Sequence, residues 1–189
     1  MMDYHYIIIL LCLALIMLRY ITSILIPDEL NIKKYITTTL TQYTFWNLSL
    51  IFVNIFYQDE YFERFIFINT TVIFIIYYIL HFVYRQKIKT IPNVPSSFSE
   101  SQIEIIMFLV HAVPFLYYLF RFIQEKEKIK INYNIGYETA LLNLSWTLLC
   151  FSSFDPMIAY FKINENYLYY IWCFLIVLHI SIGWILNNV

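Results

Sequence analysis

Long runs of apolar residues alternate with short polar segments along the whole 189-residue chain. A helix needs about 20 apolar residues to cross the hydrocarbon core of a bilayer. Six runs reach about that length, so we expect six transmembrane α-helices, at about residues 6–26, 36–57, 65–84, 102–123, 137–161 and 167–186. The pattern therefore predicts an all-α polytopic membrane protein with a single transmembrane domain over residues 1–189.

Proline and charged residues mark the expected ends of these helices. Pro27 stops the first run, and a charged loop with residues 59–64 separates the second from the third. The longest loop, at about 85–101, contains basic residues followed by proline and serine. Pro114 lies inside the fourth run, where a missing N–H and a steric clash predict a kink.

The composition excludes several classes of protein. The chain is 61% hydrophobic and 13% charged, whereas soluble domains are about 25% charged. It carries 12 Lys and Arg against 13 Asp and Glu, so it has no basic surplus for nucleic acid. None of the three cysteines has another cysteine or a histidine at the spacing that metal sites require. We therefore expect neither a metal nor a cofactor.

The topology leaves the orientation and the oligomeric state open. Six helices would place Arg64 and Arg121 on the same side of the membrane as both termini. That side would carry five basic residues and the opposite side six, so the positive-inside rule assigns no orientation. Because glycine and alanine are scarce, the sequence offers no small-residue face for self-association. The sequons at Asn47, Asn69 and Asn143 lie inside predicted helices, where we expect no glycosylation.

Ionisable residues inside a span are candidates for function, because a charge at mid-membrane costs roughly 3 kcal/mol. Each has a structural alternative. Arg19 and His81 are near enough to helix ends to extend to the interface. Asp155 precedes a proline that can end the fifth helix, and His179 stands alone on an apolar helix, as packing histidines do. His111 is deep and close to Pro114.

Thr44 and His111 are predicted to lie at the same depth. They are eight and nine residues into helices that start on the same side, which places both about 12–14 Å below that surface. A hydroxyl becomes a nucleophile when a neutral imidazole takes its proton. A Thr–His pair in a bilayer suits acyl transfer from a lipid ester, with Asn47 or Asn143 as a candidate oxyanion donor.

Two stretches around these residues resemble the androgen-induced gene family. They are Tyr43-Thr44-Phe45-Trp46-Asn47-Leu48-Ser49-Leu50 and Phe108-Leu109-Val110-His111-Ala112-Val113-Pro114. Trp146 and Phe154-Asp155-Pro156 are similar to further positions of that family, although Asp155 replaces its Tyr. Members are six-helix membrane hydrolases of fatty-acid esters of hydroxy fatty acids.

The resemblance implies roles for individual residues. Thr44 would be the nucleophile and His111 its base. Asn47, Asp155, His179 and Trp146 are further candidates to line or orient the pocket, His179 because of its predicted depth. Membrane lipids would be the partners, and the endoplasmic reticulum or the plasma membrane the location. Two alternatives remain, a non-catalytic membrane scaffold and a small transporter or channel. The short length and the absence of a repeat disfavour the transporter.

Overall fold

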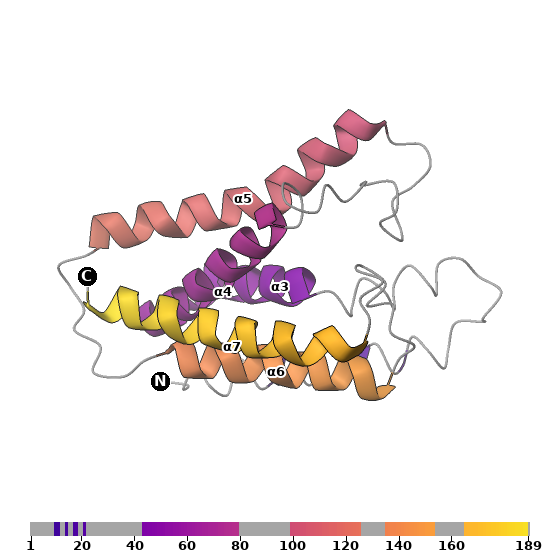
Figure 1. Cartoon of the computed structure of the whole chain (residues 1–189). Coiled ribbons are helices and arrows are strands. Elements are labelled where there is room, and N and C mark those ends of the chain that lie inside the picture. Colours follow the sequence, from indigo (N-terminus) through magenta and orange to yellow (C-terminus); the bar gives the residue numbers. More distant parts are fainter. Residues whose placement is uncertain are drawn as a thin grey trace. The chain divides into compact units, whose positions relative to one another are not determined.

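The computed structural model describes residues 43–79, 99–125, 135–153 and 165–188, with six positions between 10 and 21. Its helices are α3 (Tyr43–Tyr57), α4 (Glu60–Tyr78), α5 (Glu100–Glu125), α6 (Gly136–Ser153) and α7 (Glu165–Asn188) (Figure 1). The six described positions of the predicted first helix are also helical. The described part of the chain contains helices and no strands, which confirms the all-α prediction.

The chain divides into two compact units, Met1–Phe62 and Glu63–Val189. The first unit contains α3 and the first turn of α4. The second contains the rest of α4 with α5, α6 and α7. The contacts given below each lie within one unit.

The turn between α3 and α4 corrects the predicted loop. We expected residues 59–64 to form a charged loop, but α4 begins at Glu60. Gln58 has a left-handed φ of 46°, and its N–H donates to Asn54 O at 3.0 Å, which ends α3. Asp59 Oδ1 then accepts the N–H of Phe62 at 3.0 Å and caps α4. The prediction was wrong here because two residues are enough to make the turn.

Helix α5 begins with a reciprocal cap and bends near its middle. The Ser99 N–H donates to Gln102 Oε1 at 2.8 Å, and the Gln102 N–H donates to Ser99 Oγ at 3.3 Å. Pro114 lies inside this helix, and Figure 1 shows the change of direction. The bend agrees with the predicted kink.

Helices α6 and α7 lie side by side and run in opposite directions (Figure 1). The only two glycines of the sequence, Gly136 and Gly183, are buried in these two helices. Ala140, one turn after Gly136, is also buried. Small residues allow two helix backbones to approach closely. The three small residues Gly136, Ala140 and Gly183 therefore occupy buried positions of α6 and α7.

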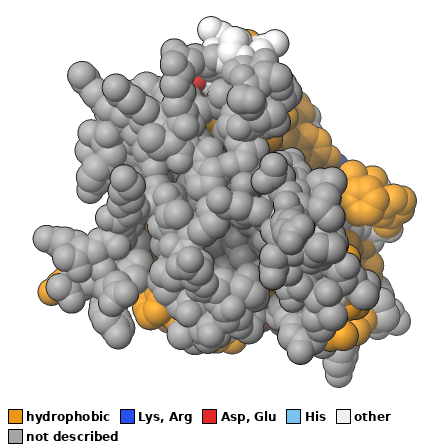
Figure 2. Space-filling model, turned by 90° about the vertical axis from the view of Figure 1, so that its right-hand side faces the viewer, with side chains coloured by type: hydrophobic (Ala, Val, Ile, Leu, Met, Phe, Trp, Pro, Cys, Tyr) orange, Lys and Arg blue, Asp and Glu red, His pale blue; other side chains and the backbone are white. Residues whose placement is uncertain are grey.

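Polar as well as apolar side chains are buried in the described helices, and many large apolar side chains are exposed. Phe56 on α3, Ile123 on α5 and Tyr170 on α7 are 76%, 63% and 74% exposed. Hydrophobic side chains likewise dominate the described surface in Figure 2. The buried polar side chains are Asn47, Asn54, Arg64, Asn69, Thr70, Thr139, Asn143 and His179. Buried polar side chains are less common than buried apolar ones in a water-soluble domain.

One described segment, Glu104–Gln124, is long and apolar enough to cross a membrane, and Trp172–Asn188 is a shorter apolar helix. Only 11% of the most apolar part of Glu104–Gln124 is buried. A core helix of a soluble protein would be mostly buried.

Candidate functional site

The His111 imidazole is held in one orientation by its own helix. His111 lies in α5, three residues before Pro114, and is half-buried. Its Nδ1 is 2.7 Å from the main-chain oxygen of Met107, one turn earlier. A carbonyl oxygen can only accept a hydrogen bond, so Nδ1 carries the proton of the neutral ring. The lone pair is therefore on Nε2, which is the atom that can act as a base.

Tyr77 fixes the same ring from the neighbouring helix. The Tyr77 ring, on α4, stacks on the His111 ring with centroids 4.3 Å apart and planes 9° from parallel. The hydrogen bond to Met107 acts in the plane of the imidazole, and the stack acts on its face. Together they restrict rotation of the ring. Sequence analysis did not single out Tyr77, because one tyrosine has no distinguishing signal among 18.

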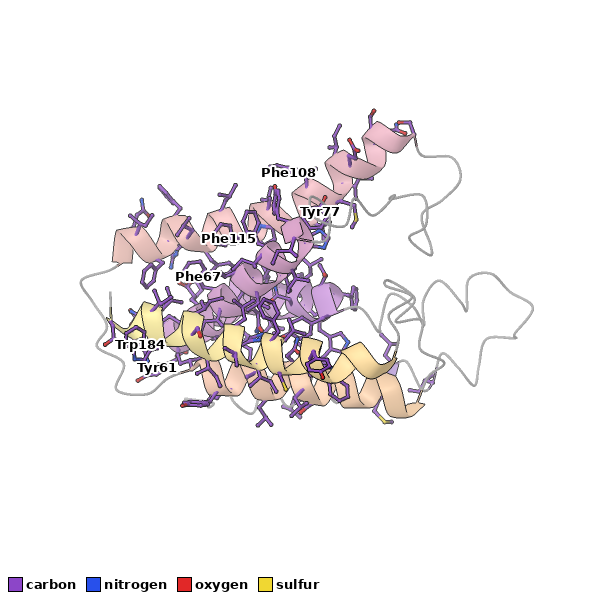
Figure 3. All side chains as sticks on the ribbon, in the orientation of Figure 1. Tyr61, Phe67, Tyr77, Phe108, Phe115 and Trp184 are labelled. Atoms are coloured by element: carbon purple, nitrogen blue, oxygen red, sulfur yellow. The ribbon has the colours of Figure 1, made fainter. Side chains whose placement is uncertain are left out.

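The stack on His111 is the last contact in a continuous aromatic series between α4 and α5. Phe67, Phe115 and Tyr77, labelled in Figure 3, belong to it. Neighbouring ring centroids are 4.3–6.2 Å apart, and the Arg64 guanidinium lies 5.5 Å from the first ring. In order, the groups are Arg64, Phe122, Phe67, Phe115, Phe74, Tyr78, Tyr77 and His111. Such contacts stabilise helix pairs beyond the area they bury.

Charged groups join three helix ends at the Arg64 end of this series. Arg121 Nη2, near the end of α5, lies 3.0 Å from both carboxylate oxygens of Glu63 in the first turns of α4. Arg64 Nη1 donates to Leu186 O near the end of α7 at 3.5 Å. These contacts place the start of α4 and the ends of α5 and α7 together. Arg64 and Arg121 therefore lie at the same end of the helices that they join, and their side of the membrane stays a prediction.

Glu104 is a further polar residue near His111 that sequence analysis did not select. It precedes His111 by seven residues on α5, which is close to two full turns and puts both residues on one face of the helix. Its side chain is exposed. It interacts electrostatically with Tyr77. A titratable group therefore lies on the exposed side of the stacked pair.

Thr44 and Asn47 lie three residues apart on one face of α3. Thr44 is half-buried, and Asn47 is 3% exposed. Among the residues that the structure describes, Asn47 Oδ1 has no hydrogen-bond partner. Because α3 belongs to Met1–Phe62 and His111 to the other unit, the pairing of Thr44 with His111 stays a prediction.

His179 is the most deeply buried of the predicted site residues. It is 0% exposed on α7, and its Nδ1 donates to Leu175 O at 2.7 Å. It therefore has the same tautomer as His111, with the lone pair on Nε2. The arrangement fits the packing role that we weighed for a lone histidine in an apolar helix.

The other candidates are only partly described. Asn143 is buried in α6, at 3% exposure. Trp146 belongs to the same helix, but its side chain lies outside the described part, as do residues Arg19, His81 and Asp155 entirely. The sequon asparagines Asn47, Asn69 and Asn143 are all buried within helices, as predicted. The described residues contain no group of three or more metal-binding side chains.

Comparison with known proteins does not extend this picture. No family model, curated protein or solved structure matches the chain. The resemblance to the androgen-induced gene family therefore rests on the two short stretches around Thr44 and His111 and on the positions near Trp146 and Asp155.

Proposed function

We propose that this chain is a multi-pass membrane protein that hydrolyses lipid carboxylic esters, with His111 as its general base. The membrane part is supported by the distribution of side chains. Burial of asparagine, threonine and histidine beside exposed phenylalanine and isoleucine is costly in water. The same distribution is favourable when lipid surrounds the helices, because polar groups then find partners only inside the protein.

The observation that carries the catalytic part is the geometry of His111. Its Nδ1–H is donated to Met107 O and its face is covered by Tyr77. A base in an acyl-transfer site needs a fixed ring and a lone pair on the nitrogen that faces the nucleophile. The stack and the hydrogen bond supply the fixed ring, and the tautomer leaves the lone pair on Nε2, the nitrogen that the proposal assigns to the nucleophile.

In the proposed reaction Thr44 is the nucleophile. His111 Nε2 takes the proton of Thr44 Oγ, which attacks the ester carbonyl, and the amide of Asn47 donates to the oxyanion. Collapse releases the alcohol, which takes the proton back from Nε2. Water then attacks the acyl-threonine with the same proton transfers, so that the acid leaves and Thr44 is restored. An endomembrane or the plasma membrane is the proposed location.

The membrane part is tested by the environment of single cysteines along α5. Leu116 is 50% exposed, and Ala112, one turn earlier, is 1% exposed. A spin label on Leu116→Cys in proteoliposomes should be relaxed by oxygen, which enters lipid, and not by a water-soluble nickel complex. A label on Ala112→Cys should be shielded from both. Strong relaxation of the Leu116→Cys label by the nickel complex would show that this face is in water.

The catalytic part is tested by covalent labelling with a fluorophosphonate probe. Wild-type membranes should be labelled, and Thr44→Ala and His111→Ala should each abolish labelling at matched expression. Thr71→Ala is the matched control, because the Thr71 hydroxyl is already committed to Phe67 O at 2.7 Å. Labelling that persists in Thr44→Ala would assign the nucleophile elsewhere. A folded wild type without labelling would leave the non-catalytic scaffold as the better description.

A further inference from the structure

Hydrolysis of an ester at neutral pH releases a proton as well as the two products. Ester and water give a carboxylate, an alcohol and H⁺, because the product acid is ionised. In an aqueous active site this proton is taken up by solvent. Inside a bilayer it needs a protein group that can carry it to the surface.

His111 is not arranged to pass that proton through its ring. A relay would take a proton at Nε2 and release it from Nδ1 on the other side. Here Nδ1–H is donated to the main-chain oxygen of Met107 at 2.7 Å, and a peptide oxygen does not act as a base near neutral pH. His111 therefore takes up and returns protons at Nε2 alone, and a separate acceptor for the proton of the product acid would leave Nε2 free for the next cycle.

Glu104 has the position that such an acceptor requires. It is the only acidic residue between positions 101 and 124, and its side chain is exposed. It is also the first residue of the segment that is long enough to span a membrane. Seven residues separate it from His111 on α5, which corresponds to about 10 Å along the helix axis.

Tyr77 lies beside His111 on the neighbouring helix. Its ring covers the face of the His111 imidazole, and its side chain interacts with Glu104. A phenol can both donate and accept a hydrogen bond. Its hydroxyl is thus suited to hold an ordered water or a product carboxyl group between His111 and the helix start.

We propose that Glu104 is the proton exit of the His111 site, with Tyr77 beside its path. The proposal rests on the hydrolase function proposed above. The product acid transfers its proton to the Glu104 carboxylate, which gives the free carboxylate and neutral Glu104. Neutral Glu104 then releases the proton to water at the exposed start of α5. No bond other than O–H is made or broken in this step.

The experiment measures hydrolysis of a 4-methylumbelliferyl fatty-acid ester by the full chain in lipid nanodiscs. In weak buffer Glu104→Gln should lower kcat by about tenfold, less than the roughly 10²–10⁴-fold that a proton-transfer group in the chemical step contributes. Added imidazole, at constant pH and ionic strength, should restore most of the rate, because a small base can replace the lost carboxylate. Glu104→Asp should keep the carboxylate and most of the rate. Glu100→Gln, which removes the other glutamate at the start of α5, should behave as wild type.

The outcomes separate this proposal from the function on which it rests. If His111→Ala abolishes hydrolysis while Glu104→Gln equals wild type, the hydrolase stands and the proton exit is wrong. If Glu104→Gln is slow but imidazole restores nothing, Glu104 has a structural role and the proposal is overturned. If wild type neither hydrolyses the ester nor reacts with the fluorophosphonate probe, both proposals fail together.

Discussion

Arg121 and Glu63 form an ion pair in which a single guanidinium nitrogen lies 3.0 Å from both carboxylate oxygens. The two residues are 58 positions apart and link the end of α5 to the start of α4. Because Arg121 follows His111 by less than three turns, the pair also fixes the register in which Tyr77 meets His111. A charged contact at one end of the helix pair therefore supports the geometry of the candidate base at the other.

A double-mutant cycle tests this ion pair. Arg121→Ala and Glu63→Ala should each lower the thermal stability of the solubilised full chain, and the double variant should lose less than their sum. Because 38% of the Arg121 side chain is exposed, we expect a coupling of roughly 0.5–1 kcal/mol after solvent screening. Gln124→Ala, an exposed residue in the same helix end, is the control. Strict additivity would show that the contact contributes nothing to stability.

The Tyr77–His111 stack predicts the chemical reactivity of the imidazole. Tyr77→Phe keeps the ring, so the rate at which diethyl pyrocarbonate modifies His111 should not change. Tyr77→Ala removes a contact worth about 0.5–1.5 kcal/mol and should raise that rate by up to about tenfold. Peptide mass spectrometry measures both rates.

His179 is the internal control for this experiment, since it is fully buried and should stay unreactive in every Tyr77 variant. Equal His111 rates in wild type and Tyr77→Ala would contradict a shielding stack.

The sequence predicts several helices well because a long apolar helix is specified by local properties. Apolar length and flanking charge determine where a span lies, and α5 and α7 each begin and end within two residues of the predicted positions. The turn before α4 was missed for a local reason as well. A charged stretch suggests a loop, but Asp59 is a helix cap, and helix caps place acidic residues in the first turn.

The candidate site is predicted less completely, because it depends on contacts between helices. His111 could be selected from one sequence, since a histidine deep in an apolar run is rare. Tyr77 could not, because it precedes His111 by 34 positions and lies on a different helix, and nothing in the spacing brings the two rings together. Glu104 carries no distinguishing signal either, because acidic residues are common near helix starts. Its relation to His111 becomes visible only when Tyr77 is placed between α4 and α5.

The buried position of Gly183 in α7 should not tolerate a larger side chain. Gly183→Leu places a side chain at a buried position of a helix that packs along α6, and overpacking of this kind costs about 1–3 kcal/mol. Thermal unfolding of the solubilised chain should show a clear loss of stability. Trp184→Leu is the control, because Trp184 is 62% exposed and adjacent in sequence. If both variants were equally stable, Gly183 would not lie in a close contact.

Replacement by alanine should have different effects on stability and labelling at His179 and at His111. His179 is 0% exposed, so His179→Ala leaves a cavity that should cost roughly 2–4 kcal/mol. Labelling by the fluorophosphonate probe, per folded molecule, should be retained. His111 is only half-buried, so His111→Ala should cost less stability and yet abolish labelling. The reverse result, in which His179→Ala stays stable but is no longer labelled, would make His179 the base and His111 a packing residue.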